Sequence, residues 1–390
     1  MRRLQQKGFS MRFWLVNGTL HTAVSPEVLR ADLLVENGRI AAIGTAPADG
    51  SATVDCSGLQ IFPGLVEAHS HTGLDGFAIG YEGEDQNEYN DPVCPELRAI
   101  DGFNPFDKAV ERARKAGITC IATGAGSANA LGGTFTAVKT VGRCTDDMVV
   151  KEAVAMKCAF GENPKNRHKE KSISSRMTIA AKLRGALAKA REYMRKLDEA
   201  ESKGGKKPDF DFRSEALLPV LRGEIPLKAH AHQTNDILTA IRIAKEFGVK
   251  LTLDHCTEGH LVAEEIARAG VPVAVGPSLS FPSKPELANK SFATPGILDR
   301  AGVPVSIVTD APVIPQEYLA LSAALAVKAG MDPFHALQAI TINPARMLGI
   351  ADRVGSLEVG KDADLLVSDD DILNPLSQVK AVYIDGCRCE

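Results

Sequence analysis

The chain has 390 residues, of which 44% are hydrophobic and 24% are charged, the composition of an ordinary globular protein. The formal net charge of −4 indicates no basic surface, so neither nucleic acid nor an anionic membrane is expected as a partner. No window approaches the ~18 consecutive apolar residues of a membrane span. The basic start of the chain lacks the apolar core of a secretory signal. We therefore expect a cytoplasmic protein whose eight cysteines do not form a disulfide framework.

Short strands are expected at both ends of the chain. Residues 12–62 contain two hairpin signals, Asn17-Gly18 and Asn37-Gly38, each lying between apolar segments. Similar strand patterns, "LEVGKDADLLV" and "VKAVYIDG", occur close to the C-terminus. We therefore predict one small β-sandwich domain that residues 1–62 and 348–390 build together.

Residues 63–347 repeat one pattern, in which a helical segment ends in glycine and an apolar strand with a polar end follows. In 237–247, for example, apolar residues recur at helical spacing, and Gly248 stands where a left-handed helix cap is expected. The strands are almost continuously apolar, as in a parallel sheet that is buried on both faces. The pattern predicts α/β architecture, and the length favours a (β/α)₈ TIM-type barrel.

Two segments interrupt this repeat. Residues 163–214 are rich in lysine and arginine and then helical, which predicts an insert with an exposed amphipathic helix and a solvated charged face. Residues 73–106 are polar and acidic, and they follow the first barrel strand directly. They are either a lid that contacts substrate or a surface loop without a role, and the sequence favours neither.

Polar residues gather at the predicted C-terminal ends of the barrel strands, where the functional groups of such barrels lie. They are His69 and His71 after the first strand, His230 and His232 in "KAHAH", His255 in "LTLDH", and Asp310 in "SIVTD". Taken singly, each is more often a structural residue or a helix cap. Together they place five of the nine histidines at three strand ends. Because imidazole and carboxylate groups are ligands of zinc and similar ions, the sequence predicts a metal site.

With these motifs the chain resembles the amidohydrolase superfamily of metal-dependent hydrolases. The resemblance rests on "PGLVEAHSH", on His230 and His255, on "TDAP" with Asp310, and on "ITINPARMLGIADRVGSLEVGKDADLLV" near the C-terminus. It extends over about residues 12–390 apart from the insert, and it implies a (β/α)₈ barrel with a composite β-sandwich. It also implies a divalent metal cofactor of one or two ions, for which we expect zinc.

Carried over residue by residue, the resemblance implies a ligand set and a reaction. His69 and His71 would bind one ion, while His230 and His255 would bind a second ion or contact substrate. Asp310 would be both a metal ligand and the general base and acid. A metal-bound hydroxide would attack an amide carbonyl, and Asp310 would pass the proton to the leaving nitrogen.

The fourth barrel strand, expected in "EAVAMKCAFGENP", would supply a further ligand in members that bind two ions. That ligand is either a carboxylated lysine or a glutamate in the superfamily. Here we prefer Glu162, which stands at the end of the strand, to Lys157, which lies within it. The alternatives are that Lys157 packs as a buried stem and that Glu162 is only a turn residue.

Within the superfamily, the segment from Lys228 to Asp310 is most similar to the imidazolonepropionase-related branch. The resemblance then implies that Gln233 and Glu258 line the substrate site, and that His232 orients substrate or a metal ligand. Deaminases of the superfamily carry a proton-transferring glutamate at the position of Gln233, so deamination is less expected. The run "TDAPVIPQEY" departs from imidazolonepropionase itself, so that enzyme's own substrate is not assigned.

We therefore expect a hydrolase that cleaves a non-peptide C–N bond, in an amide or cyclic amide, of a small-molecule substrate. The alternative is a prolidase-like dipeptidase, because such members share "HAH" followed later by a single histidine. A non-catalytic scaffold is a third reading, and retention of both histidine pairs argues against it. We further expect a homo-oligomer.

Overall fold

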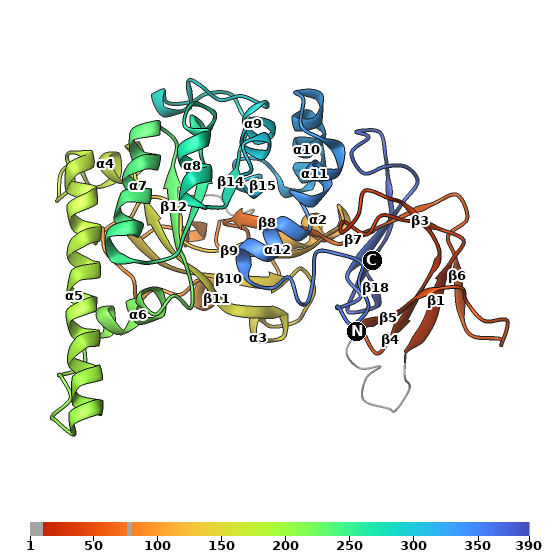
Figure 1. The fold of residues 1–390 in the computed structure, drawn as a ribbon, viewed down its shortest axis with the longest axis horizontal. Helices are drawn as coiled ribbons and strands as arrows, with labels where there is room; N and C mark the ends of the chain where they lie inside the picture. The colour runs from red at the N-terminus through yellow and green to blue at the C-terminus, as the bar shows by residue number, and fades with distance from the viewer. Residues whose placement is uncertain (1–10, 76–79, 390) are drawn as a thin grey trace.

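A computed structural model of the chain describes residues 11–75 and 80–389. Its main sheet has eight strands, β8 to β15, which are hydrogen-bonded in chain order and wrap into a nearly closed barrel (Figure 1). The strands are β8 (Leu65–Ser70), β9 (Ile118–Thr123), β10 (Leu131–Lys139), β11 (Val149–Ala159), β12 (Leu227–Ala231), β13 (Leu251–His255), β14 (Val273–Val275) and β15 (Val305–Ile307). The TIM-type barrel that the repeating pattern predicts is therefore confirmed.

Helices alternate with most of these strands and cover the outside of the barrel (Figure 1). They are α1 (Ala99–Gly102), α2 (Lys108–Lys115), α3 (Thr145–Met148), α7 (Thr234–Phe247), α8 (Ala263–Ala269), α9 (Thr294–Arg300), α10 (Leu319–Lys328), α11 (Pro333–Gln338) and α12 (Ile342–Leu348). As the glycine pattern predicts, α7 ends at Gly248 in the left-handed conformation. Within the described ranges, no helix is both long and apolar enough to cross a membrane.

The third barrel strand departs from the all-parallel prediction. β10 is antiparallel to both β9 and β11, whereas the other hydrogen-bonded neighbours in the barrel are parallel. Residues 124–130 connect β9 to β10, and residues 140–148 connect β10 to β11. A parallel return needs a crossover of about a dozen residues or more, so these connections only allow the chain to turn back.

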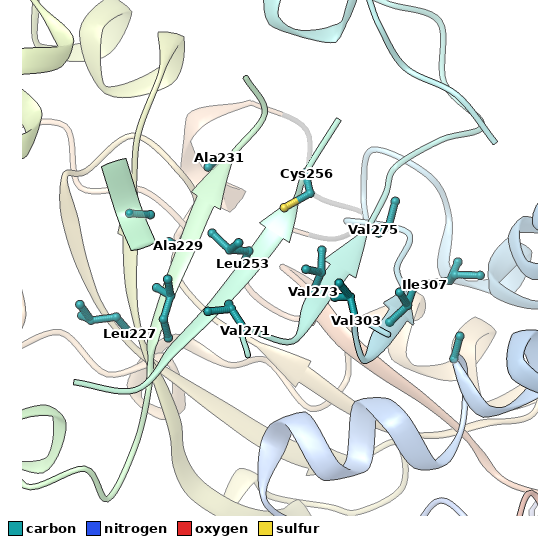
Figure 2. Close-up of a cluster of buried hydrophobic side chains, with 14 of the residues drawn as sticks. Leu227, Ala229, Ala231, Leu253, Cys256, Val271, Val273, Val275, Val303 and Ile307 are labelled. Carbon is teal, nitrogen blue, oxygen red and sulfur yellow. The ribbon is translucent and has the colours of Figure 1, made fainter. Parts of the chain in front are cut away.

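Figure 2 shows the buried hydrophobic side chains of β12 to β15. Leu227, Ala229 and Ala231 occupy alternate positions of β12, and all three belong to the main hydrophobic core. Because successive strand residues point to opposite faces, Lys228 and His230 lie on the other face, toward the barrel interior. The alternation of the strands therefore decides which polar residues reach the centre of the barrel.

Two further sheets lie beside the barrel: the six-stranded one combines strands from both ends of the chain, whereas the strands of the four-stranded one all lie within residues 12–55. A six-stranded sheet has the order β18-β17-β16-β7-β2-β3, and a four-stranded sheet has the order β5-β4-β1-β6. Their strands are β1 (Arg12–Val16), β2 (Thr19–Leu20), β3 (Leu29–Arg30), β4 (Asp32–Glu36), β5 (Arg39–Gly44), β6 (Thr53–Asp55), β7 (Gln60–Pro63), β16 (Leu365–Ser368), β17 (Val379–Ile384) and β18 (Cys387–Cys389). Leu15, Leu33, Leu365 and Tyr383 share one core between them. The division of the chain at residues 62 and 348 stays a prediction.

A buried ion-pair cluster connects the barrel to these sheets. Lys139 lies at the end of β10 and is 4% exposed. Its Nζ lies 2.8 Å from Asp362 Oδ2, 3.0 Å from Asp364 Oδ1 and 2.5 Å from Asp385 Oδ1. All three carboxylates belong to the C-terminal part of the chain, so one barrel lysine fixes that part to the barrel.

The segment 163–214 is mostly helical and contains α4 (Glu162–His168), α5 (Arg176–Lys203) and the start of α6 (Phe212–Leu221). α5 buries one face, which includes Ile179, Leu183 and Leu187, and it stands at the edge of the barrel away from the terminal sheets (Figure 1). Among its described residues, the polar segment 73–106 forms short helical turns and two isolated bridges to β10, Val93 with Leu131 and Arg98 with Thr134. Residues 76–79 lie outside the described part of the chain. The role of segment 73–106 as a lid or a surface loop stays open.

Candidate metal centre

The C-terminal ends of four barrel strands bring predicted metal ligands together. His69, His255 and Asp310 form one group of donor atoms that lie within 4.8 Å of one another. His230, His232 and His255 form a second such group. The four histidines are buried, whereas the Asp310 side chain is 15% exposed and reaches the mouth of the barrel. The two groups share His255, so they make one continuous centre.

His71 belongs to the same centre. Its Nε2 lies 3.4 Å from Asp310 Oδ1, and the Nε2 of His69 lies 3.2 Å from the same oxygen. As the spacing on β8 predicts, the two side chains turn toward one side, and their ring centroids lie 5.2 Å apart. The first histidine pair therefore converges on the carboxylate that ends β15, although 239 positions separate residue 71 from residue 310.

Hydrogen bonds at Nδ1 of His71 and His255 decide which ring nitrogen of each histidine carries the proton and which has a lone pair for a metal ion. His71 Nδ1 lies 2.8 Å from the carbonyl oxygen of Gly124, and His255 Nδ1 lies 2.7 Å from that of Gly276. A carbonyl oxygen only accepts, so these partners assign the ring proton to Nδ1 and the lone pair to Nε2. Metal-binding histidines are held in this way in other proteins.

The donor atoms fit a divalent ion. The Nε2 atoms of His69, His230 and His255 are buried and have no hydrogen-bond partner among the described residues. Leaving such a group unpaired costs about 1–3 kcal/mol, so three in one place indicate a ligand for their lone pairs. Burial lowers the pKa of His255 to about 3 and keeps the ring neutral, as a metal ligand must be. Neutral imidazoles with a carboxylate form a donor set that zinc and related ions accept.

The backbone is strained at two positions of this centre. His255 has φ 73° and Asp310 has φ 55°, in the left-handed region that non-glycine residues seldom occupy. Such conformations cost about 1–3 kcal/mol each and cluster at functional sites, where the surrounding fold enforces them. Both strained residues are ones that the sequence predicts as ligands.

A buried charge cluster that sequence reasoning missed lies next to His69. Asp254 is fully buried, and its Oδ2 lies 3.1 Å from His69 Nδ1 while its Oδ1 accepts from Lys228 Nζ at 2.6 Å. Burial alone would raise the pKa of Asp254, but its contact with His69 and the charges of Lys228 and Lys157 outweigh burial and lower that pKa well below its usual value. The signal was present, because Lys228 and Asp254 stand on buried strands at inward-facing positions.

Lys157 and Glu162, the two candidate ligands from the region of the fourth strand, occupy different places in the structure. Lys157 is fully buried inside the barrel, with Nζ 3.5 Å from Asp254 Oδ2. Glu162 begins α4 beyond the end of β11 and belongs to neither donor group. Its Oε1 accepts the backbone N–H of Glu286 at 3.0 Å, and its own N–H donates to Glu286 Oε2 at 3.0 Å. Glu162 thus holds a loop, and its role as a metal ligand stays a prediction that this geometry does not favour.

The residues predicted to bind substrate hold neighbouring segments in place. Gln233 Oε1 accepts from Arg176 Nη2 at 2.6 Å, and Glu258 accepts the backbone N–H of Thr234 at 2.8 Å. His232 instead lies in the centre, with Nδ1 2.8 Å from Thr257 Oγ1. Substrate contacts by Gln233 and Glu258 stay predictions.

A buried carboxylate from the loop after β14 also reaches the centre, and sequence reasoning missed it. Glu286 is 1% exposed, and its Oε1 lies 3.7 Å from His232 Nε2 and 3.9 Å from His230 Nε2. Burial would raise its pKa, but its contact with His232 and the charge of Lys284 outweigh burial and lower that pKa. Nothing in the local sequence "SKPELANK" marks this glutamate, because only the path of the loop brings it to the histidines.

A cleft of about 860 Å³ opens at the other end of the barrel, beside Pro226, Leu251 and Pro272. These residues stand at or before the N-terminal ends of β12, β13 and β14. In barrels of this type the chemistry lies at the C-terminal ends of the strands, so the histidine centre, not this cleft, is the candidate site.

An eight-stranded barrel with buried histidines and an aspartate at its C-terminal mouth has the architecture of a metal-dependent hydrolase. The model of the amidohydrolase family matches residues 60–387. The chain therefore belongs to the amidohydrolase family, as its motifs predict. It is therefore an enzyme of the amidohydrolase family.

Individual relatives agree with this assignment. Amidohydrolase tasK of Hapsidospora irregularis is 30% identical to this chain, and the match covers 91% of the chain. The same match covers only 39% of the length of tasK. Imidazolonepropionase of Thermoplasma volcanium is 24% identical, over 91% of this chain and 89% of its own length. This likeness confirms the resemblance to the imidazolonepropionase-related branch.

Solved structures show the same fold. An amidohydrolase from Thermotoga maritima MSB8 has a TM-score of 0.94 and 40% sequence identity, over 97% of this chain and 99% of that chain. A prolidase complexed with N-methylphosphonate-L-proline has a TM-score of 0.64 at 15% identity, which shows likeness of fold alone.

Proposed function

We propose that the chain hydrolyses an amide or cyclic amide C–N bond of a small molecule, with a divalent metal ion at the histidine centre. The observation that carries the proposal is the convergence of two histidines and Asp310: the Nε2 atoms of His69 and His71 lie 3.2 and 3.4 Å from one oxygen of Asp310. We propose zinc as the ion, because an imidazole-rich set with one carboxylate suits it.

A divalent ion in such a centre supplies Lewis acidity, which makes water nucleophilic near neutral pH. The chain supplies the proton transfer. Burial alone would raise the pKa of Asp310, but its contacts with His255, His69 and His71 outweigh burial and lower that pKa well below its usual range. Asp310 is therefore ionised and able to accept a proton from the attacking water. Its partial exposure at the mouth lets it deliver that proton to the leaving nitrogen of the substrate.

The barrel interior holds the histidines in position for this reaction. His71 and His255 are fixed through Nδ1 by backbone carbonyl oxygens, and His69 by the buried carboxylate of Asp254. Such fixed orientation places reacting groups without a further entropic cost during the reaction. Dipeptide hydrolysis stays the alternative, and its support is the likeness of fold to prolidases.

The test combines metal analysis with a substrate screen. Purified protein is analysed for zinc, iron, manganese and nickel, and then assayed on cyclic amides, N-acyl amino acids and dipeptides. We expect a stoichiometric divalent metal and hydrolysis of a cyclic or N-acyl amide that chelation removes and added metal restores. Protein without stoichiometric metal would contradict the proposal, and cleavage of dipeptides alone would favour the alternative.

A further inference from the structure

The second group of donor atoms lies next to a carboxylate for which the reaction above has no role. His230, His232 and His255 offer ring nitrogens within 4.8 Å of one another. Glu286 Oε1 approaches the Nε2 atoms of His232 and His230 to 3.7 and 3.9 Å. The Nε2 atoms of His230 and His255 are buried without a hydrogen-bond partner in the part of the chain that the structure describes. The cluster thus contains three imidazoles and one carboxylate.

Glu286 is held rigidly in this position. Its second oxygen, Oε2, accepts the backbone N–H of Glu162 at 3.0 Å, while Glu162 Oε1 accepts the backbone N–H of Glu286 at 3.0 Å. We call this reciprocal pair of hydrogen bonds the Glu162–Glu286 clasp. The clasp joins the loop after β14 to the first residue of α4 and leaves Oε1 of Glu286 directed toward the histidines.

We propose that Glu286 and His232, together with His230 and His255, are ligands of a second ion in this centre, next to the ion at His69, His71 and Asp310. The inference rests on the proposed metal-dependent function, and it adds two ligands that the family resemblance does not supply. Donor atoms around a tetrahedral zinc ion lie about 3.3 Å apart when the bonds are about 2.0–2.1 Å long. The contacts of 3.7 and 3.9 Å at Glu286 therefore need to close by only a few tenths of an ångström.

Lys284 does not prevent this coordination. Its Nζ lies 2.6 Å from Glu286 Oε1 and accounts for one lone pair of that oxygen. An ionised carboxylate offers about four lone-pair positions, so Oε1 can accept from Lys284 and also face a cation. Asn163 Oδ1 accepts from the same Nζ at 2.8 Å, so the lysine has a second partner when the carboxylate turns toward the ion.

Two glutamine substitutions form a matched pair for the test. In Glu286→Gln and in Glu162→Gln the amide oxygen still accepts the partner's backbone N–H, so the Glu162–Glu286 clasp is kept in both. Only Glu286→Gln removes a carboxylate that faces the histidines. We expect wild-type protein to bind two equivalents of Zn²⁺, by chelator competition. Glu286→Gln should bind its weaker ion at least about 10–100-fold less tightly, because removing only a residue that orients a ligand already costs that much. Glu162→Gln should match wild type.

His69→Ala distinguishes the two ions, because His69 belongs to the donor group that contains Asp310 and not to the one that contains His230 and His232. In that background, adding Glu286→Gln should weaken the binding of the remaining ion by the same factor. If Glu286→Gln fails to fold, His232→Gln should weaken it in its place. Unchanged Zn²⁺ stoichiometry and affinity in Glu286→Gln and His232→Gln would overturn the inference, as would an equal loss in Glu162→Gln. A single ion that His69→Ala abolishes would overturn the inference and leave the proposed function intact. Absence of metal from wild type would overturn both.

Discussion

The buried cluster around Lys139 gives a prediction about how the barrel and the terminal sheets are held together. In Lys139→Met the stem of the side chain keeps its packing, while the charge that faces Asp362, Asp364 and Asp385 is lost. The Lys139 side chain is 5% exposed, and those of Asp362 and Asp364 are 4% and 1% exposed. Removing one partner of a buried ion pair costs about 3–5 kcal/mol, because the other charge is left without compensation.

The three carboxylates contribute unequally to this cost. Asp362 keeps Arg353, whose Nη2 lies 2.7 Å from Oδ2, and the Asp385 side chain is 49% exposed, so solvent screens it. Asp364 has no arginine partner like that of Asp362 and is not screened by solvent like Asp385, because its side chain is only 1% exposed. Burial already raises its pKa above the usual value. We therefore expect a loss near the lower limit, about 3 kcal/mol at pH 8, and most of it arises at Asp364.

The loss should depend on pH in a defined direction. Without Lys139, the pKa of Asp364 in the folded protein rises further above its value in the unfolded chain. A carboxyl with a raised folded pKa destabilises the protein above that pKa, and the penalty disappears as pH falls toward the unfolded value. The difference between wild type and Lys139→Met should therefore be larger at pH 8 than at pH 5.

Urea unfolding of the metal-free proteins, followed by circular dichroism, measures this difference, because bound metal would add its own stabilisation. Lys115→Met is the control, since Lys115 is 59% exposed and pairs with Glu111 at 2.7 Å on the surface. Such a pair contributes about 0–1 kcal/mol. Two results would refute this role of Lys139. One is that Lys139→Met loses no more free energy of unfolding than Lys115→Met at pH 8, and the other is that the loss in Lys139→Met grows as the pH is lowered.

Three predictions concern the metal centre. Asp310→Asn should abolish turnover but retain most of the metal, because the histidines supply most of the coordination; turnover close to wild type would contradict its role in proton transfer. His69→Ala should lose metal, and an unchanged metal content by elemental analysis would exclude it as a ligand. Asp254→Asn should weaken metal binding about 10–100-fold, because the carboxylate beside His69 Nδ1 then no longer orients the ring. Equal metal affinity in Asp254→Asn and wild type would show that Asp254 serves only Lys228.

Local patterns along the chain determined the class of fold and most of the first ligand group. The alternation of apolar helices and strands needs only neighbouring residues to be recognised, and it predicts the barrel. His69 and His71 are two apart on one strand, so their common direction follows from strand geometry alone. The same reasoning placed His230, His255 and Asp310 at strand ends, which a barrel necessarily brings to one rim.

Tertiary structure decided the features that depend on the path of loops and on contacts distant in sequence. The reversal of β10 follows from connection lengths that become visible only when the strand limits are known. Glu162 and Glu286 are 124 positions apart, and only the folded chain brings them into reciprocal hydrogen bonds; the role of Glu162 as a metal ligand stays a prediction. The loop after β14 carries Glu286 to the histidines, because its course is set by packing against the barrel rim and not by any local pattern. Sequence therefore determined which strand ends carry the predicted ligands, and three-dimensional packing determined which carboxylates lie beside them.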